Sequence, residues 1–346
     1  MKQKFVLTGG GTAGHVYPTL AVAEKLGDCE LAYIGGNGME KEILKSFPKI
    51  AYYEIPTAKL ERKFTLKNLL IPFKLLKSIH ESKKILKKLK PNAIFSKGGF
   101  VSVPVVLAGR RLKIPIISHE SDLSLGLANR IILKKCDKMC TTFAETIKNS
   151  PKTVHTGQPI REKIFHGKKQ RFFRENKPIL LVLGGSLGAK FINEIIFSHL
   201  DELCKHFNVL HITGKKNYQK IEHEGYFCIP YAENIEDFYA SSDIVLARAG
   251  SGVINELLAL QKPMLLIPLS KKCSRGDQIE NAKNFKSHGY ADYLEEENFS
   301  WQRLLKRLSN ISNNKEKYIV KMKKAQECRA SEMIAMMLKD IANKKK

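Results

Sequence analysis

The sequence predicts an α/β protein built from two doubly wound domains that face each other across a cleft. Short apolar runs alternate with amphipathic stretches along the chain, which is the rhythm of βαβ units with buried parallel strands. The rhythm restarts in mid-chain, and each half has a glycine-rich loop between a strand and a helix, GGGTAG at 9–14 and GGSLGA at 184–189. A length of 346 residues also favours two domains.

The first half contains four apolar runs that we interpret as parallel strands. These runs are residues 5–8, 31–34, 93–95 and 114–118. Polar or glycine-rich segments follow three of them: the loop at 9–14, SKGGFVSV at 96–103 and HESD at 119–122. Ligands of open α/β sheets bind at the carboxyl ends of the strands, so we expect these segments to share one functional edge.

The second half repeats this plan after a crossover near residues 156–167. Its apolar runs are residues 179–183, 209–212, 244–247 and 264–267. The last stretch, residues 315–346, is helical in pattern and strongly basic.

One segment of the second half, ARAGSGVINELLALQKPMLLIP, has the chemistry of a nucleotide site. Ser251 and Gly252 open a helix whose N-terminus suits a diphosphate. Glu256, in the second turn, could hold the hydroxyls of a ribose or only stabilise the helix dipole. Gln278 and Asn281 follow the next strand and would suit sugar hydroxyls, although they could equally begin a surface helix.

The first glycine loop fits the G-x-G-x-x-G pattern of dinucleotide sites. Such a site also needs an acidic residue at the tip of the second strand. The tip here is Gly35–Gly36, without Asp or Glu, which argues against NAD. His15 stands in the first turn of the following helix, where the helix N-terminus favours the neutral imidazole that a general base requires. A helix-capping or phosphate-binding role for His15 is the open alternative.

The charge balance favours an anionic partner. The chain has 59 Lys and Arg against 34 Asp and Glu, a net charge of +25, which suits nucleic acid, anionic lipid or a phosphorylated substrate. A lysine-biased proteome would give the same excess. Single-stranded nucleic acid binding would want aromatic residues within basic strands, and the lone Trp301 does not supply them, so we expect no nucleic acid.

We expect neither a metal nor another cofactor. The seven cysteines are scattered, and Cys136 and Cys140 lack the second ligand pair of a zinc site. No Asp-x-Asp pair stands beside a strand to hold Mg²⁺. Helix N-termini can neutralise a leaving diphosphate without a metal.

Residues 59–90 suit the surface of a membrane. They contain eleven Lys and Arg and two Glu, a net charge of +9, and no apolar run in the chain approaches the roughly 18–20 residues that span a bilayer. Apolar residues at helical spacing are expected to face the core; they are Leu66, Leu69, Leu70, Phe73 and Leu76. Ile71 and Leu75 fall off that face, and with Lys74 and Lys77 they are expected to contact anionic lipid. A solvated helix face with an ordinary core stripe is the open alternative.

Together these motifs resemble the MurG family of peptidoglycan glycosyltransferases. The resemblance covers essentially the whole chain and is carried, in order, by GGGTAGHVYPTLAVA, SKGGFVSVP, HESDLSLGLANR, TGQPIRE, LGGSLGAKFIN, the ARAGSG segment and DQIENA. It implies the GT-B fold, with an acceptor and membrane-docking domain at 1–160 and a UDP-sugar donor domain at 161–327. A helix at about 328–346 is then expected to pack back on the first domain.

The resemblance also implies an activity. This is inverting transfer of N-acetylglucosamine from UDP-GlcNAc to the C4 hydroxyl of the N-acetylmuramic acid of undecaprenyl-linked lipid I, which gives lipid II. The enzyme would be peripheral at the cytoplasmic face of the bacterial inner membrane, with anionic lipid and cell-wall or divisome proteins as further partners. The alternative is another GT-B UDP-sugar-dependent glycolipid glycosyltransferase, which would have different acceptor-side loops. A UDP-sugar epimerase of the same fold would be expected to carry carboxylates for moving protons.

Site roles follow by position. His15 and Glu120 are rival candidates for the general base. Some members have HEQN where this chain has HESD, so Asp122 stands where an asparagine contacts the donor. The residues implied to contact UDP-GlcNAc are Thr12, Ala13, Gly14, Asp122, Arg161, Ser186, Ala232, Ser251, Gly252, Val253, Ile254, Asn255, Glu256 and Gln278.

Overall fold

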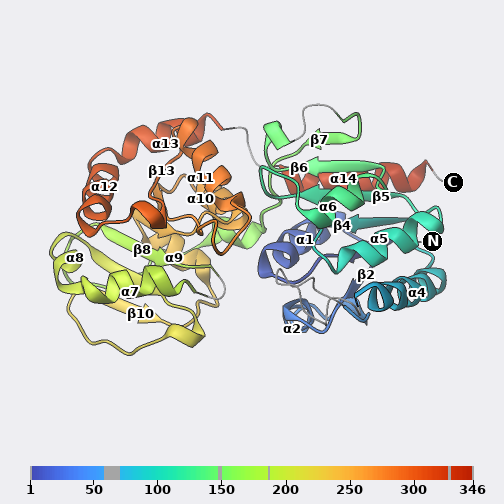
Figure 1. Ribbon diagram of the computed structural model, residues 1–346, viewed down its shortest axis with the longest axis horizontal. Helices are drawn as coiled ribbons and strands as arrows, with labels where there is room; N and C mark the ends of the chain where they lie inside the picture. Colours follow the sequence, from blue (N-terminus) through green and yellow to red (C-terminus); the bar gives the residue numbers. More distant parts are fainter. Residues whose placement is uncertain (1, 58–70, 147–149, 186–187, 326–328, 345–346) are drawn as a thin grey trace. The chain divides into compact units, whose positions relative to one another are not determined.

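The chain forms two units, each built on one parallel sheet (Figure 1). The computed structural model describes residues 2–57, 71–146, 150–185, 188–325 and 329–344. Unit 1 comprises Met1–Arg161 and Cys328–Lys346, and unit 2 comprises Glu162–Glu327. The predicted α/β class with two parallel sheets is confirmed.

Among the described residues, the sheet of unit 1 has seven strands in the order β3-β2-β1-β4-β5-β6-β7, all parallel. Their bounds are β1 Lys4–Thr8, β2 Glu30–Gly35, β3 Ile50–Glu54, β4 Ala93–Ser96, β5 Ile116–Glu120, β6 Lys138–Thr141 and β7 Thr153–His155. The order reverses between β1 and β4, which is where open α/β sheets bind ligands. The sequence predicted β1, β2, β4 and β5 but missed the others, because β3 and β7 are partly exposed and β6 begins with an exposed lysine instead of an apolar residue.

Helices cover both faces of this sheet. They are α1 Ala13–Leu26, α2 Met39–Leu44, α4 Ile71–Leu89, α5 Ser102–Arg111, α6 Leu127–Leu133 and α14 Ala330–Asn343, with the 3₁₀ turn η1 Ala144–Thr146. One core joins Val16 and Leu20 of α1 and Ile334 and Leu338 of α14 to the strands. The other core joins the strands to α4, α5 and α6. The helix α14, near the C-terminus, therefore lies against α1, near the N-terminus (Figure 1).

The structure corrects the predicted orientation of α4. Phe73 and Leu76, expected in the core, are 71% and 61% exposed, whereas Leu75, expected at the surface, packs against the core and Ile71 is partly buried. The buried stripe of α4 includes Ser78 and Ser82, so the spacing of apolar residues alone predicted the wrong buried face. The hydroxyl of Ser78 donates to the carbonyls of Lys74 and Pro56, which satisfies it inside the protein.

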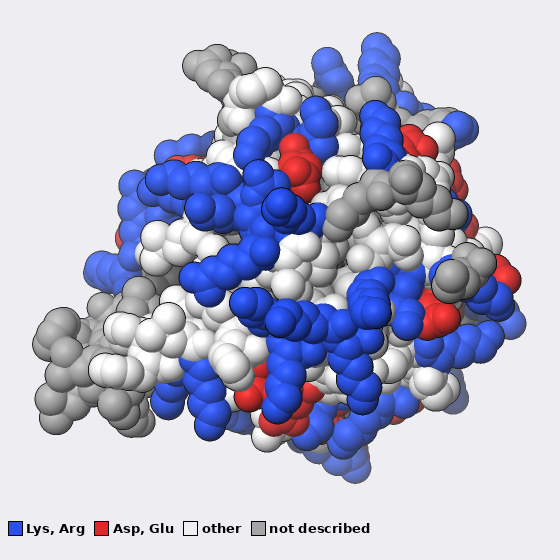
Figure 2. Space-filling view, turned by 90° about the vertical axis from the view of Figure 1, so that its right-hand side faces the viewer, with Lys and Arg blue, Asp and Glu red and all other residues white. Residues whose placement is uncertain are grey.

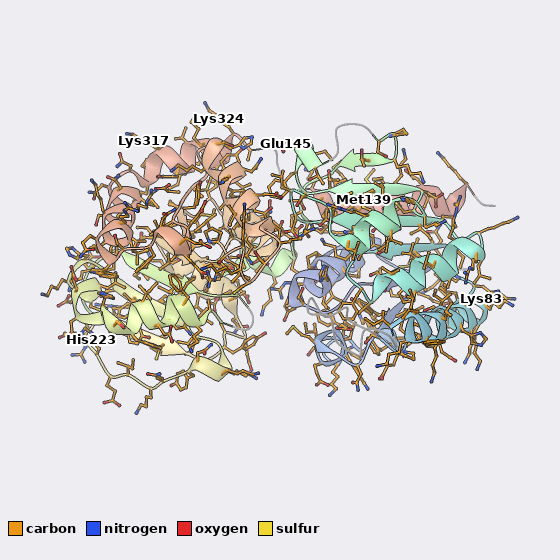
Figure 3. All side chains as sticks on the ribbon, in the orientation of Figure 1. Lys83, Met139, Glu145, His223, Lys317 and Lys324 are labelled. Carbon is orange, nitrogen blue, oxygen red and sulfur yellow. The ribbon has the colours of Figure 1, made fainter. Side chains whose placement is uncertain are left out.

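Lys74 and Lys77 are exposed, as expected. Figure 3 shows Lys83 on the outer side of α4 and Met139 within the sheet layer. The expectations for residues 59–70 lie outside the described residues. In the part of the chain that the structure describes, no helix combines the length and the apolarity needed to cross a bilayer.

In the described part of unit 2, six parallel strands have the order β10-β9-β8-β11-β12-β13. Their bounds are β8 Ile179–Leu183, β9 Asn208–Ile212, β10 Tyr226–Ile229, β11 Ile244–Ala247, β12 Met264–Leu266 and β13 Ala291–Tyr293. The helices are α7 Lys190–Ser198, α8 Leu200–His206, α9 Ile235–Ser241, α10 Ser251–Ala259, α11 Asp277–Ser287, α12 Trp301–Asn313 and α13 Lys315–Lys323, with the 3₁₀ turns η2 Glu162–His166, η3 Lys215–Asn217 and η4 Glu296–Asn298. One core packs α7, α8 and α12 against the sheet.

Candidate functional site

The loop from β1 to α1 presents His15 at the third position of α1. The Nδ1 atom of His15 lies 3.0 Å from the Oγ1 atom of Thr12, the residue that precedes the helix. Burial, with the nearby charge of Lys97 as a second cause, lowers the pKa of His15 to about 4. The imidazole is therefore neutral at pH 7 and retains a partly exposed surface.

Gly11 of this loop has a backbone conformation that favours glycine. Gly11 has φ +88°, and a Cβ there would lie 2.8 Å from the ring of Phe100. A side chain at this position would strain the backbone and collide with the SKGGF loop. The loop therefore passes tightly between β1 and the segment after β4.

A buried acidic residue follows the tip of β2, but it lies on α2 and binds the backbone. Glu40 of α2 is 2% exposed, and its carboxylate accepts the N–H of Gly36 at 3.0 Å and the N–H of Gly11 at 3.2 Å. Both oxygens are used by the backbone, so this acid does not serve a ribose as it would in an NAD site. Sequence reasoning missed Glu40 because it lies beyond the strand tip, in a six-residue helix.

The HESD segment ends β5 and turns inward. Glu120 is 5% exposed, and its carboxylate accepts three hydrogen bonds of 3.0 Å, from the N–H of Asp122, the N–H of Gly126 and the Nδ2 of Asn129. These bonds shape the loop that leads into α6. His119 is buried, which lowers its pKa, and its Nε2 lies 2.9 Å from the carbonyl oxygen of Gly157.

A buried lysine that the sequence did not single out stands between these groups. Lys97 is 1% exposed, its Nζ donates to the hydroxyl of Ser121, and its ammonium is attracted by the carboxylates of Glu120 and Asp122. Burial nevertheless lowers the pKa of Lys97 to about 8. The negative charge that Asp122 brings is thus met by a cation from the SKGG loop.

Arg161 closes unit 1 beside α1. Its guanidinium lies over the ring of Tyr17, with 3.9 Å to the ring centroid. Among the described residues, its buried Nε has no hydrogen-bond partner. The cation–π contact fixes the side chain against α1.

In unit 2 the segment from Ser251 to Glu256 forms the start of α10. Added Cβ atoms at Gly250 and Gly252 would meet nothing within 4 Å, so the space beside this helix start is open. Glu256 reaches back to α9, and its Oε2 accepts from the hydroxyl of Tyr239 at 3.0 Å. Asn255 is buried, and its Nδ2 donates to the carbonyl and the hydroxyl of Ser251.

Two polar residues of α11 hold loops in place. The Oε1 of Gln278 accepts the N–H of Leu269 at 3.0 Å. Asn281 has no exposed surface, and its Nδ2 donates to the carbonyl of Ala249 at 3.2 Å. The expectation that Asn281 reads sugar hydroxyls is therefore wrong, because its side chain fixes the loop before α10. Ala232 lies partly buried between β10 and α9, and Ser186 lies outside the described residues.

A polar network supports the second glycine loop. His211, fully buried on β9, contacts the hydroxyl of Tyr226 and the Oδ1 of Asn193, and the Nδ2 of Asn193 donates to the carbonyl of Thr213. Gly188 has φ +77°, and a Cβ there would lie 2.1 Å from the carbonyl oxygen of Thr213. The loop therefore requires glycine at this point. Over the described ranges, no group of three or more His, Cys, Asp or Glu could hold a metal ion.

Two family models match this chain. The glycosyltransferase family 28 N-terminal domain matches residues 5–141, and the family 28 C-terminal domain matches residues 179–337. A protein of Clostridium tetani (strain Massachusetts / E88) is 51% identical over 336 residues, covering 93% of this chain and 94% of that protein. One of Clostridium botulinum (strain Kyoto / Type A2) is 48% identical over 337 residues, covering 93% and 95%. Both are named UDP-N-acetylglucosamine--N-acetylmuramyl-(pentapeptide) pyrophosphoryl-undecaprenol N-acetylglucosamine transferase.

Solved structures share the fold. The crystal structure of Acinetobacter baumannii MurG is similar with a TM-score of 0.76 and 24% identity, covering 98% of this chain and 99% of that one. A calicheamicin glycosyltransferase is similar with a TM-score of 0.72 and 11% identity, covering 99% of each chain. These similarities confirm the expected GT-B fold.

Proposed function

This chain belongs to glycosyltransferase family 28 and, within it, to the MurG family, and we propose that it transfers N-acetylglucosamine from UDP-GlcNAc to lipid I. The acceptor is the C4 hydroxyl of N-acetylmuramic acid, and the product is lipid II, a precursor of peptidoglycan. The observation that carries the proposal is 51% identity, over 93% of this chain, to a relative named for that reaction. Its relatives give no support to the alternative of a different glycolipid glycosyltransferase.

The reaction is a displacement at the anomeric carbon of the donor sugar. The acceptor oxygen bonds to C1 as the bond from C1 to the β-phosphate oxygen breaks, so an α-linked donor gives a β-linked product. His15 takes the proton of the acceptor hydroxyl, and UDP leaves with the electron pair of the broken bond. The neutral, partly exposed imidazole of His15 supports this role. Binding of the anionic acceptor would raise its pKa toward neutrality and strengthen the base.

Glu120 has a different role in this proposal. Its two carboxylate oxygens already accept hydrogen bonds from two backbone amides and from Asn129. A base in that position would have to break these bonds before it could take a proton. We therefore assign Glu120 to shaping the loop of residues 121–126, and we assign proton transfer to His15.

Most of the proposed donor contacts lie in unit 2. The first turn of α10 offers its backbone amides and a partial positive charge to the diphosphate, with open space beside Gly250 and Gly252. Glu256 accepts from the ribose hydroxyls in addition to Tyr239. Gln278 contacts the sugar through its amide nitrogen, since its oxygen holds Leu269. The remaining donor contacts are those implied by position: Thr12, Ala13, Gly14, Asp122, Arg161, Ser186, Ala232, Val253, Ile254 and Asn255. UDP departs without a metal, because helix amides and arginine neutralise its charge.

The enzyme docks peripherally on the cytoplasmic face of the inner membrane through the start of α4. Phe73 and Leu76 are exposed beside Lys74 and Lys77, an arrangement suited to an anionic bilayer. Lys and Arg side chains also cover much of the side of unit 1 seen in Figure 2, with few acidic side chains among them. Embedding a Phe or Leu side chain stabilises binding by about 1.5–3 kcal/mol, or tenfold or more in affinity.

Vesicle binding tests the docking proposal. Phe73→Ser with Leu76→Ser should weaken binding to vesicles containing anionic lipid by at least about 100-fold, because two apolar side chains are lost. Phe165→Ser is the matched control, since Phe165 is 44% exposed but belongs to unit 2. Equal binding of the double variant and the control would reject docking through α4.

The activity is tested by UDP release. Purified chain with UDP-GlcNAc should release UDP only when a lipid I analogue is added, and should incorporate label from the sugar into lipid. UDP-glucose should be a poor donor. UDP release that does not depend on the acceptor, or no release by folded protein, would reject the proposed function.

A further inference from the structure

The loops that follow β1 and β2 are joined by a buried carboxylate. Glu40 accepts the N–H of Gly11 through Oε2 and the N–H of Gly36 through Oε1. Two tyrosines reinforce the junction: the hydroxyl of Tyr33 donates to the carbonyl of Gly9, and that of Tyr52 donates to the carbonyl of Gly36. The two rings stack with centroids 6.0 Å apart.

Glycines give this carboxylate its room. A Cβ at Gly10 would lie 2.7 Å from the Oε1 of Glu40, and one at Gly38 would lie 2.9 Å from its Oε2. A Cβ at Gly36 would lie 3.1 Å from Oε1. Glycines in both loops therefore leave room for Glu40, together with Val101 beside Gly10 and Thr57 beside Gly36. A buried carboxylate paired with two N–H donors is also a strong, charge-assisted arrangement.

Gly11, which Glu40 binds, lies in the sequence between the two residues that interact with the His15 ring. The backbone of Gly10 interacts with the imidazole, and the Nδ1 of His15 lies 3.0 Å from the Oγ1 of Thr12. Gly11, whose N–H is bound by Glu40, is the link between Gly10 and Thr12. Displacing Gly11 therefore moves both groups that fix the orientation of the ring.

The geometry points to Glu40 as a positioning residue for His15 in the transfer reaction. It touches neither substrate nor reacting atoms; it fixes the loop that holds the imidazole at the start of α1. The amide of Gly11 is thereby removed from phosphate binding. This inference rests on the proposed function of the chain, since it assigns Glu40 to the same reaction.

Two variants of Glu40 distinguish the effect of its charge from the effect of its side-chain length. Glu40→Gln keeps the shape but offers one acceptor oxygen to two converging N–H donors, so one amide loses its partner. Glu40→Asp keeps the charge but is too short to reach both amides. Glu42→Gln is the matched control: Glu42 is on the same helix, is exposed, and is paired across the surface with Lys45 at 2.7 Å.

The expected result is a loss of turnover without a loss of donor binding. In Glu40→Gln and Glu40→Asp, kcat should fall about 10- to 100-fold, as expected for misplacing a catalytic group by an ångström or less. The Kd for UDP should stay within twofold of the wild-type value, because the contacts proposed for its ribose and diphosphate on α10 lie in unit 2. Glu42→Gln should match the wild type in both. Unchanged kcat in folded Glu40 variants, or a parallel fall in kcat, UDP affinity and Tm, would overturn the inference.

A second readout does not depend on activity. Amide hydrogen exchange of Gly11 and Gly36 should be at least tenfold faster in both Glu40 variants than in the wild type, and the ring signals of His15 should shift. If the wild type shows no transfer, the proposed function fails, and this readout still decides whether Glu40 holds the loop. Equal exchange in wild type and variants would overturn the inference in either case.

Discussion

Acidifying the assay tests the state of His15 directly. Burial, aided by the charge of Lys97, lowers the pKa of this imidazole from 6.5 to about 4. At pH 5.5 a histidine of pKa 6.5 would be neutral in about 9% of molecules, whereas one of pKa 4 would be neutral in about 97%. We therefore predict that kcat/KM, which reports the free enzyme, stays within about 10% of its plateau at pH 5.5 instead of falling about tenfold.

The assay is the initial rate at low acceptor concentration between pH 4 and 8, with circular dichroism to show that the protein stays folded. The His15 ring should also be titrated by NMR and assigned by comparison with His15→Gln. Lys97→Met should raise the pKa of His15, but by less than burial lowers it, because the lysine is the second cause. An inflection of kcat/KM or of the ring signal near pH 6.5 would show that burial does not lower the pKa of His15.

Three further predictions follow from the same structure. Glu256→Gln should raise KM for UDP-GlcNAc about tenfold or more with little change in kcat, because a charged hydrogen bond of about 1.5–3 kcal/mol is lost; an unchanged KM would contradict the ribose contact. Lys97→Met should lower the free energy of unfolding measured in urea. Adding Asp122→Asn to that variant should recover about 0.5–3 kcal/mol of the loss, because the unpaired carboxylate is then removed. Additive effects of the two substitutions would show that the two charges are not coupled. Leu304→Ala should cost about 2–5 kcal/mol of unfolding free energy, and the exposed control Val320→Ala about 0.5 kcal/mol or less; similar losses would contradict the assigned core.

Local patterns gave much of the fold. A buried strand, a glycine loop and a helix are encoded by neighbouring residues, so β1 with α1 and β11 with α10 could be predicted. The same patterns put His15 in the first turn of α1 and Glu256 in the second turn of α10, where the structure has them. Their roles in catalysis and binding stay predictions.

The features that could not be predicted from the sequence depend on contacts between distant segments. The orientation of α4 is decided by which stripe packs against α5 and the sheet, and that stripe contains Ser78 and Ser82, which apolar spacing does not detect. Burial of Lys97 opposes the usual preference of lysine for water, and it is explained only by the carboxylates that gather around it. Glu40 reaches Gly11 from 29 positions away, so no fixed spacing motif includes it.

Identification of the product tests the proposed transfer reaction most directly. Purified chain, UDP-GlcNAc and a lipid I analogue should yield a disaccharide lipid in which N-acetylglucosamine is β-linked to O4 of N-acetylmuramic acid, as read by mass and by the anomeric proton coupling in NMR. His15→Ala should lose this product while UDP still binds. An α-linkage, a different acceptor hydroxyl, or no lipid product from folded protein that binds UDP would contradict the proposed reaction.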